Sequence, residues 1–516
     1  AIIGDRAEAT VIEDHSEAIS IDPSLAEAYV GRGVARHDQG NLEGAIEDHS
    51  RAIALRPDSA EAYTDRGNVR RDLGDLAGAI EDHSRAIVLE PENAWAFLNR
   101  GTARYDQADL DGAIEDLSRA IELDPELARA YTNRGLARQL QGDVAGAIED
   151  HSRAIALDPT NGPYYVNRGW ARRWQGDLAG AVEDHSRAIA LDPNGAGAYM
   201  QRGTARYERG DIAGAIRDYS RAIALEPGLA DSHAARGVAR LVQGDPEGAV
   251  EDLSRAIEIE PDFAAAHGDR GLARHAQGDL EGAIADYGQA LALDPNLVDA
   301  WVNRAHARCR LGDLAEAVED FSRAIALDPD HAEAHRGRGL ARRDLGQLEG
   351  AVRDLSRAIE LDPDLAGANR DRGLVRRALG DLDGAIEDFS RAIELDPNDV
   401  AAHGSRGLAR RAKGDLEGAI EDYTRAIALA PDLAEAHVNR GLARAALGDL
   451  GGALEDYDRA IAIDPGLWQA FVNRGRAEAA RGDPAASARS FEEALRLAPP
   501  GARAGIEELR RQLLGE

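Results

Sequence analysis

The chain has 516 residues and a net charge of −32, from 61 Lys and Arg against 93 Asp and Glu. A negative charge of this size opposes binding to nucleic acid and to anionic membranes, which reward clustered Lys and Arg. Aromatic residues make up only 4% of the chain, which holds 54 Gly and a single Cys. Such small side chains favour thin layers of closely packed helices over several thick globular cores, and one cysteine excludes a disulfide framework.

A repeat dominates the order of elements along the chain. Prolines recur every 34 residues from Pro23 to Pro499 without an insertion, which defines fourteen repeats over residues 24–499. We number the repeats from the N-terminus and call a set of equivalent positions, 34 residues apart, a column. In repeat 1, helical spacing predicts a first helix over 26–39 and a second helix over 42–55.

Local signals mark the starts of these helices. Asp75 is expected to cap the second helix of repeat 2, after a Gly-Asp turn. The residue directly after the proline is Ser, Thr, Asp or Asn in ten of the fourteen repeats, which predicts that the next first helix starts there.

The repeat resembles the tetratricopeptide repeat (TPR) family, whose 34-residue signature is W-x2-L-G-x2-Y, then A-x3-F, then P. The matching positions of repeat 2 are Tyr63, Arg66, Gly67, Arg70, Ala79, His83 and Pro91. The resemblance covers almost the whole chain. It implies an all-α, right-handed superhelical solenoid of antiparallel helix pairs. It also implies a concave groove, lined by the first helices, in which peptides or partner proteins bind.

Charged columns depart from the family pattern. Where the family has Leu, all fourteen repeats have Arg, from Arg32 to Arg474, and where it has Tyr, thirteen have Arg, from Arg36 to Arg444. The second helix supplies Asp in thirteen repeats, from Asp48 to Asp456, and repeat 14 lacks the second Arg and the Asp together. We predict a partly buried Arg–Asp network, in which the loss of one partner strands a charge. The alternative is an Arg stripe that binds anionic ligands.

Ten of the fourteen histidines fall in two columns that the family fills with aromatic residues. The second-helix column holds His15, His49, His83, His151 and His185, and the first-helix column holds His233, His267, His335, His403 and His437. No repeat has His in both columns, so we interpret them as compensated core packing rather than metal ligands. Acid pH should charge these side chains and loosen the solenoid.

The two ends differ from the repeats. Residues 1–23 are predicted to form an incomplete N-terminal repeat with only a second-type helix, over 11–22, so we expect that sequence is missing upstream of Ala1. Residues 500–516 are predicted to form an amphipathic helix with Ile506, Leu509 and Leu513 on one face. It resembles the C-terminal capping helix of the family.

Residues that break the columns are the candidates for function, and repeats 3 to 6 hold most of them on the expected groove face. The candidate peptide-binding residues are Trp95, Asn99, Tyr105, Asn133, Asn167, Trp170, Trp174, Met200, Gln201 and Tyr207. The carboxamides form one column, and they can donate to and accept from an extended peptide backbone. Exposed aromatic side chains supply strong binding contacts. The alternative is that Trp170 and Trp174 only pack across neighbouring repeats.

A second anomaly is a basic patch in repeats 10 to 12 that flanks the same face. Its members are Arg336, Arg343, Arg370, Arg377 and Arg411. Such a patch suits an acidic tail, a C-terminal carboxylate or a phosphate. Asp344 and Asp371 lie among these residues, so the alternative of ordinary solvated surface charge is favoured.

No catalytic constellation is evident. Cys309 follows His306 by three residues, which only superficially resembles a nucleophile–base pair. We therefore expect no enzyme, no cofactor and no metal. The leading hypothesis is a cytoplasmic scaffold that binds a partner protein or extended peptide, and neither nucleic acid nor membrane. Two alternatives stay open: a sensor or substrate-selecting arm of a larger enzyme whose catalytic domain lies upstream, and a scaffold that self-assembles through its open N-terminal end.

Overall fold

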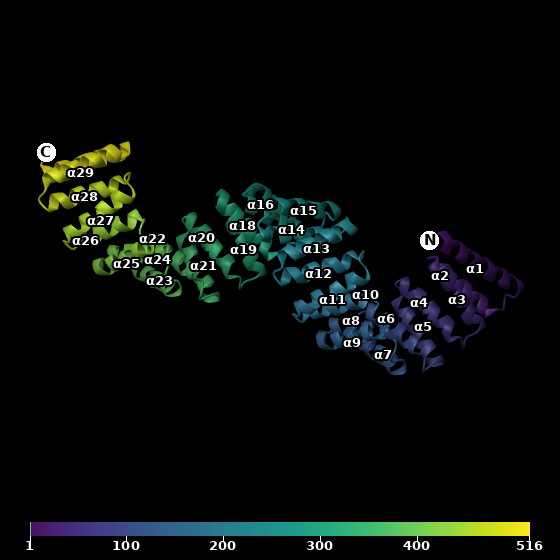
Figure 1. The fold of residues 1–516 in the computed structure, drawn as a ribbon. Coiled ribbons are helices and arrows are strands. Elements are labelled where there is room, and N and C mark those ends of the chain that lie inside the picture. Colours follow the sequence, from purple (N-terminus) through teal and green to yellow (C-terminus); the bar gives the residue numbers. More distant parts are fainter. Residues whose placement is uncertain (1, 516) are drawn as a thin grey trace. The chain divides into compact units, whose positions relative to one another are not determined.

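The computed structural model describes the backbone of residues 2–515 and the side chains of residues 10–515. Within the described chain there are thirty α-helices and no strand, which confirms the predicted all-α solenoid of helix pairs. The contacts divide the chain into two compact units. The N-terminal unit ends at Pro261 and the C-terminal unit begins at Asp262. In each unit the helices follow one another in chain order (Figure 1).

The N-terminal unit begins with α1 (Ile2–Ile21). Its first helices are α2 (Ala26–Asp38), α4 (Ala60–Asp72), α6 (Ala94–Asp106), α8 (Ala128–Leu140), α10 (Gly162–Trp174), α12 (Ala196–Glu208) and α14 (Ala230–Gln243). Its second helices are α3 (Leu42–Leu55), α5 (Leu76–Leu89), α7 (Leu110–Leu123), α9 (Val144–Leu157), α11 (Leu178–Leu191), α13 (Ile212–Leu225) and α15 (Pro246–Ile259).

The C-terminal unit repeats the same arrangement and ends with α30 (Pro500–Leu514). Its first helices are α16 (Ala264–Gln277), α18 (Val298–Leu311), α20 (Ala332–Asp344), α22 (Ala366–Ala378), α24 (Val400–Lys413), α26 (Ala434–Ala446) and α28 (Trp468–Ala480). Its second helices are α17 (Leu280–Leu293), α19 (Leu314–Leu327), α21 (Leu348–Leu361), α23 (Leu382–Leu395), α25 (Leu416–Leu429), α27 (Leu450–Ile463) and α29 (Pro484–Leu497).

Each pair is an antiparallel hairpin, because the loop between its helices, such as 39–41, is too short for any other return. Within a unit, a first helix contacts the second helix of its own pair, the second helix of the preceding pair and, more lightly, the next first helix. First helices therefore form one continuous face, and second helices form the opposite layer.

The helix starts follow the predicted signals with one correction. Asp75 caps α5, because its Oδ1 accepts a hydrogen bond from the Gly78 N–H at 3.0 Å. The N-cap of each first helix, however, lies one residue later than predicted, and in only four of these helices, α4, α6, α20 and α24, does its side chain accept a hydrogen bond. Ser59, the second residue after the proline, accepts from Ala62 N at 3.3 Å. The residue directly after the proline instead donates its N–H to the preceding aspartate, as Ser24 does to Asp22 at 2.9 Å, so it serves the loop rather than the helix.

The layers are thin because glycine and alanine line the contact between the two helices of a pair. A Cβ added at Gly67 would lie 2.6 Å from Cε1 of His83, closer than real Cβ atoms approach other atoms. Ala79 and Ala86 on α5 are fully buried. Only small residues let the two backbones come this close, which explains why the chain folds with so few large side chains.

The predicted Arg–Asp network is present in repeats 1 to 13, and in most of them it joins three helices. Repeat 9 is an exception, because Gly288 offers no hydroxyl to Arg304. In repeat 2, Nε and Nη2 of Arg66 donate to the two carboxylate oxygens of Asp82 at 2.9 and 2.7 Å. Arg70 donates to the same carboxylate at 2.9 Å. The remaining Nη1 of Arg66 donates to Ser50 of the preceding second helix at 3.1 Å. Asp82 is only 2% exposed, so this carboxylate is held by arginine rather than by water.

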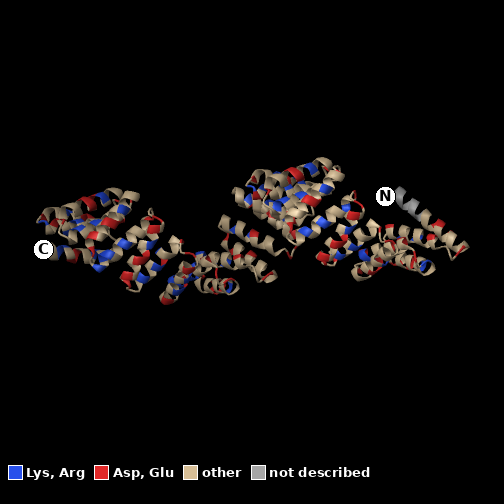
Figure 2. Ribbon diagram, turned by 90° about the horizontal axis from the view of Figure 1, so that it is seen from below, with Lys and Arg blue, Asp and Glu red and all other residues tan. Residues whose placement is uncertain are grey.

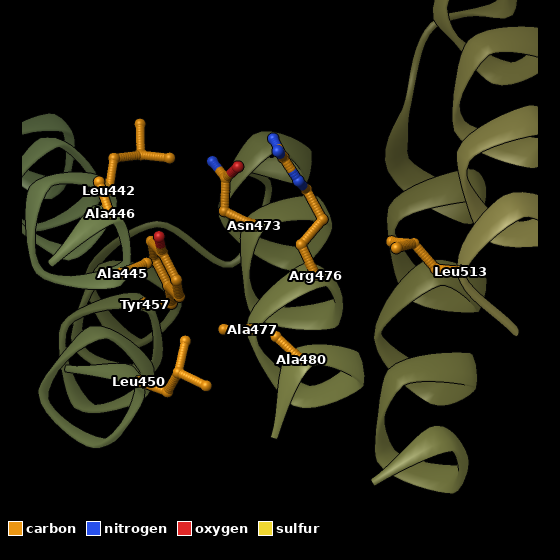
Figure 3. A pocket seen from close by; sticks show the side chains of 10 residues that line it. All are labelled: Leu442, Ala445, Ala446, Leu450, Tyr457, Asn473, Arg476, Ala477, Ala480 and Leu513. Atoms are coloured by element: carbon orange, nitrogen blue, oxygen red, sulfur yellow. The ribbon is translucent and has the colours of Figure 1, made fainter. Parts of the chain in front are cut away.

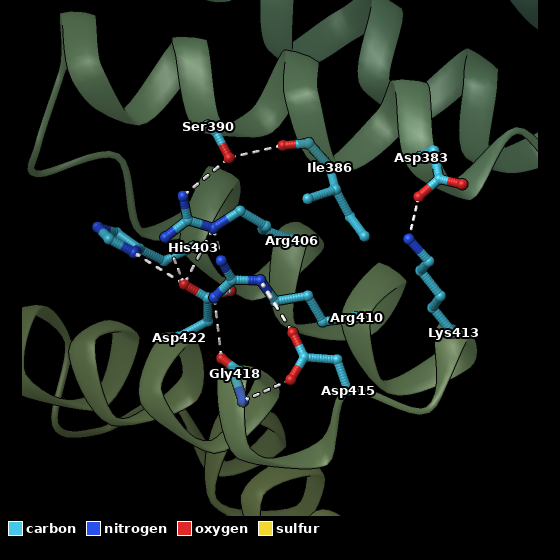
Figure 4. A network of polar contacts seen from close by, with 10 residues as sticks. All are labelled: Asp383, Ile386, Ser390, His403, Arg406, Arg410, Lys413, Asp415, Gly418 and Asp422. Atoms are coloured by element: carbon cyan, nitrogen blue, oxygen red, sulfur yellow. Dashed lines mark hydrogen bonds and ion pairs between the residues drawn. The ribbon is translucent and has the colours of Figure 1, made fainter.

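The same network recurs in repeat 12, where Figure 4 shows the guanidinium groups of Arg406 and Arg410 both directed at the carboxylate of Asp422. Charged residues of both signs are interspersed along the helices of both units (Figure 2). Each arginine of these two columns is thus paired inside its repeat, which leaves no stripe of free guanidinium groups for an anionic ligand and disfavours that alternative.

Repeat 14 replaces the network rather than losing it. Arg474 donates to Ser490 Oγ at 3.0 Å, and Ser490 in turn donates to Glu478 at 2.7 Å. The acid has therefore moved from the second helix to the first. Arg474 also reaches Asp458 of the preceding second helix at 2.8 Å, at a position where most earlier repeats have Ser. The link between neighbouring pairs is kept with different residues.

The histidine columns lie in the helix interface. His49, His83, His151 and His185 are fully buried, and neither ring nitrogen of any of them has a hydrogen-bond partner. Burial lowers the pKa of each to about 4. In the first-helix column, His335 directs Nε2 to the carbonyl of Pro329 at 3.1 Å, and because a carbonyl only accepts, this nitrogen carries the proton. Within the described residues no group of His, Cys, Asp and Glu is arranged to hold a metal ion.

The helices at the two ends are α1, which is longer than the predicted helix over 11–22, and α30, which spans Pro500–Leu514. Helix α1 begins at Ile2 rather than near residue 11 and packs on α2. Helix α30 packs on α29 and α28. Ile506 is buried and Leu509 packs beside Phe471 and Phe491, whereas Leu513 stays largely exposed. Helix α30 thus covers the last pair with one apolar face.

Asp82→Asn is expected to destabilise its repeat by about 3 kcal/mol, because the change strands Arg66 and Arg70 beside a neutral amide. Hydrogen exchange of amides in α4 and α5, followed by mass spectrometry, should become roughly a hundredfold faster. Glu81→Gln alters the exposed neighbour and should change exchange by less than a factor of about three. Equal effects of the two substitutions would contradict the role given to the network.

Acid should destabilise the N-terminal unit through the four buried histidines. Their folded pKa of about 4 lies below the unfolded value of about 6.5, so stability present above pH 6.5 is lost as the pH falls toward 4, by up to about 1.4 kcal/mol per pH unit and histidine. Replacing all four with Leu, the residue that Leu117 and Leu253 already supply in this column, should flatten the fall in melting temperature between pH 7 and pH 5. An unchanged fall would refute this explanation.

Candidate peptide-binding site

The candidate residues of repeats 3 to 6 lie on neighbouring helices of the N-terminal unit. They belong to α6, α8, α10 and α12, which contact one another in that order. The structure therefore brings these four segments, far apart in sequence, onto one continuous face of first helices.

The carboxamide column is mostly without internal partners. Asn133 donates from Nδ2 to Thr102 Oγ1 at 2.9 Å, which ties α8 to α6. Asn99, Asn167 and Gln201 are partly exposed, and their side chains make no hydrogen bond within the described chain. Three of the four carboxamides can thus offer both donor and acceptor to a ligand.

The tryptophans of this face are exposed and held in place. Trp174 is 50% exposed, and its ring lies 5.6 Å from that of Trp170 at an interplanar angle of 53°. Both come from α10, so they pack on each other one turn apart rather than only across repeats. Trp95 is equally exposed, and the Arg129 guanidinium lies 5.9 Å from its ring centroid. Such cation–π and ring–ring contacts orient the rings without burying them.

Three other candidates contribute mainly to packing. Tyr105 packs against the buried cluster around Leu117, and burial raises its pKa, with a smaller effect of Asp106. Met200 and Tyr207 pack against the cluster around Tyr219. All three keep part of their surface exposed, so they form the floor beside the carboxamides.

Sequence reasoning missed several residues of this face. Leu140 on α8 is the residue equivalent to Trp174 one repeat earlier. It is exposed, so it extends the apolar surface onto α8. Gln139 is only 1% exposed, yet neither atom of its amide has a hydrogen-bond partner. Arg173 pairs with Glu208 of the next first helix at 2.6 Å. The available signal was that the column of Gln139 varies strongly between repeats, with Tyr105 and Tyr207 among its members.

The basic patch of repeats 10 to 12 is largely neutralised. Arg336 pairs with Asp371 at 2.9 Å, and Arg370 pairs with Asp399 at 2.7 Å. Arg343 pairs with its neighbour Asp344 at 2.8 Å. Within the described chain, only Arg377 and Arg411 of the five carry no ion pair. The patch therefore offers two guanidinium groups rather than five.

The C-terminal unit has a pocket at the first-helix positions that are equivalent to the candidate residues of the N-terminal unit. A pocket of about 380 Å³ runs from α26 across α28 to α30 (Figure 3). Its lining residues are Leu442, Ala445, Ala446, Leu450, Tyr457, Asn473, Arg476, Ala477, Ala480 and Leu513. Burial raises the pKa of Tyr457 to about 12, against the opposing effect of Arg476. The face that carries the candidate residues in the N-terminal unit thus forms a concavity in this unit.

Cys309 and His306 do not form a catalytic pair. Burial, with a smaller effect of Asp344, raises the pKa of the Cys309 thiol to about 11, so the thiolate is scarce at neutral pH. The His306 ring packs edge-on against Phe321 at 5.1 Å, and burial lowers its pKa. Both side chains serve the packing of α18 on α19.

Comparison with known proteins identifies the class of this repeat. A family model described as TPR repeat matches residues 33–70, 67–108, 101–142, 203–244, 241–278, 271–312, 373–410 and 407–448. Two further models described as tetratricopeptide repeat match residues 302–366, and 128–161 and 434–467. These segments cover more than half of the chain, which therefore belongs to the tetratricopeptide repeat family. It is a protein-interaction scaffold of a generally non-catalytic class.

Solved structures of the same kind are similar to this chain. A chain of the APC/C hetero-tetramer Cut9-Hcn1 is 16% identical, with a TM-score of 0.42 over 87% of this chain and 96% of that chain. MamA is 30% identical, with a TM-score of 0.31 over 32% and 96%. YrrB, a TPR protein with an unusual peptide-binding site, is 25% identical, with a TM-score of 0.33 over 39% and 99%. No curated protein matches the sequence.

A membrane-spanning helix is not found in the described part of the chain, because none of its helices is both long and apolar enough.

Cys309 should react slowly with iodoacetamide. A thiol pKa of about 11 leaves on the order of a hundredfold less thiolate at pH 7.5 than an ordinary cysteine has. The alkylation rate of the native chain should therefore be about a hundredfold below that of the same chain unfolded in urea. Native and unfolded rates within a factor of about three would show that the thiol is activated after all.

Proposed function

We propose that this scaffold binds an extended polypeptide segment across α6, α8, α10 and α12 of the N-terminal unit. The observation that carries the proposal is the row of carboxamides without internal partners beside the half-exposed Trp174. Neither feature is needed to hold the repeat together, since other repeats fold without them.

The spacing of the carboxamides suits a peptide backbone. Asn99, Asn167 and Gln201 occupy one column on successive or alternate first helices. An extended chain that crosses these helices presents an N–H or C=O group at intervals along its length, and a carboxamide can bond to either. Asn133, already bonded to Thr102, would keep the row aligned between α6 and α8.

The aromatic side chains supply the apolar part of the contact. Trp174 is fixed against Trp170, so little rotational freedom is lost when a ligand covers it. Leu140 and Trp95 add exposed apolar surface on the two preceding first helices. Aromatic anchors of this kind carry most of the binding energy in protein interfaces.

A phage-displayed library of random 12-residue peptides, selected on the full chain, supplies the ligand for a test. The selected peptides should bind Trp174→Ala and Asn167→Ala variants at least about tenfold more weakly than the parent chain, which is the usual effect of removing an anchor. Calorimetry or fluorescence polarisation gives the dissociation constants.

Val242→Ala is the matched control, because Val242 is an exposed residue of the same column as Trp174, two repeats further on. It should leave the affinity unchanged, and all three variants should keep the helical circular dichroism spectrum. Peptides that bind the Trp174→Ala and Asn167→Ala variants as tightly as the parent would refute the site.

A further inference from the structure

The C-terminal unit contains a second hollow, in its first three helices, that the peptide site does not involve. It measures about 320 Å³, lies between α16 and α18, and has Tyr287 of α17 at its base. The lining residues are Ala265, Gly268, Asp269, Leu272, Tyr287, Asn296, Leu297, Val298, Asp299, Ala300 and Asn303. Two carboxylates and no Lys or Arg line it, so the pocket is acidic.

Three polar groups of this pocket have no internal partner. Asp269 is partly buried and makes no ion pair or hydrogen bond within the described chain, and burial raises its pKa to about 6. Tyr287 is fully buried, and its hydroxyl lacks a hydrogen-bond partner. The Tyr287 pKa is raised by burial and by the nearby Asp269 charge. The Asn303 amide also makes no hydrogen bond with a described residue.

The other repeats show that this pocket is particular to repeat 8. Gly268 stands in a column where Val30, Val302 and Val438 supply an apolar side chain, and its missing side chain opens the space above Ala290. Asp269 stands in the column that holds Asn in six repeats. No other repeat combines Gly and Asp at these two neighbouring positions, so the space and the charge of this pocket occur together only in repeat 8.

The chain itself shows what a carboxylate of this column binds. Asp371, three repeats later in the column of Asp269, accepts from Nε of Arg336 at 2.9 Å and is buried by that contact. A guanidinium therefore reaches this position on a first helix. Asp269 has the same carboxylate and no such cation.

We propose that the pocket between α16 and α18 receives a cationic side chain, a lysine or an arginine, from a partner polypeptide. Asp269 neutralises the charge, with Asp299 at the exposed edge, and the Tyr287 and Asn303 oxygens accept further hydrogen bonds from it. Leu272, Leu297 and Val298 enclose the methylene stem. The net charge of −32 attracts a basic partner over longer distances.

The small probes for the test are N-acetyl-lysine methylamide, N-acetyl-arginine methylamide and the uncharged N-acetyl-norleucine methylamide. Saturation-transfer NMR with the full chain at pH 7.5 should show binding of at least one of the two cationic probes, at millimolar affinity, and at least tenfold weaker binding of the norleucine probe. Asp269→Asn should weaken binding of the cationic probe at least tenfold. The variant is expected to fold, since Asn is the common residue of this column.

Asp65→Asn is the matched control, because Asp65 occupies the same column in repeat 2, outside the pocket. It should leave probe binding unchanged. Equal binding of the norleucine and cationic probes, or full affinity in Asp269→Asn, would overturn the proposal. These results leave the Trp174 site untouched, because that site lies in the N-terminal unit and is tested with separate peptides.

Discussion

The contact on which this structure depends is the buried aspartate held by two arginines. A carboxylate such as Asp82 leaves water only because Arg66 and Arg70 satisfy its oxygens, and the same Arg66 reaches back to Ser50 of the preceding pair. In most repeats one guanidinium group thereby joins the two helices of a pair and also bonds to the preceding pair; Arg304, which follows Gly288, lacks the second bond. Repeat 14 keeps the link after exchanging the acid and the hydroxyl between helices. In a solenoid each helix pair contacts only its neighbours. A hydrogen bond of fixed geometry between neighbouring pairs therefore fixes the orientation of each pair relative to the preceding one.

This constraint distinguishes the residues that every repeat needs for folding from the exposed residues that can vary. The arginine, aspartate, glycine and alanine columns face the interior of the stack, where every repeat needs the same residues. The exposed face of the first helices carries no such requirement, so residues there are free to differ between repeats. Trp174, Gly268 and Asp269 are differences of this kind. The two proposed sites use opposite chemistry, an amide and aromatic surface in the N-terminal unit and an acidic pocket in the C-terminal unit, on equivalent positions of one scaffold.

The sequence predicted the structural features that recur in every 34-residue repeat. It located the helices of the fourteen repeats to within a few residues, although α1 begins nine residues earlier than predicted. It also predicted the Arg–Asp pairing, because fourteen near copies reveal which positions change together. It did not predict contacts between repeats that break the period, such as Arg336 with Asp371 or Arg173 with Glu208, because these depend on how far one first helix lies from the next. For the same reason the Asp269 pocket escaped notice: it requires a missing side chain at Gly268 and a buried hydroxyl from another helix. The capping residue was misplaced by one, because the aspartate before the proline captures the following N–H.

The most direct test of this account is a substitution scan of the full chain that reads abundance and binding of a selected peptide separately for every variant. The account predicts that substitutions in the arginine and aspartate columns lower abundance in all repeats, with binding reduced only in proportion. Substitutions of Trp174 and Asn167 should lower binding at normal abundance. Variants of the arginine columns that abolish binding while abundance stays normal would contradict it, because those guanidinium groups would then serve a ligand rather than the fold.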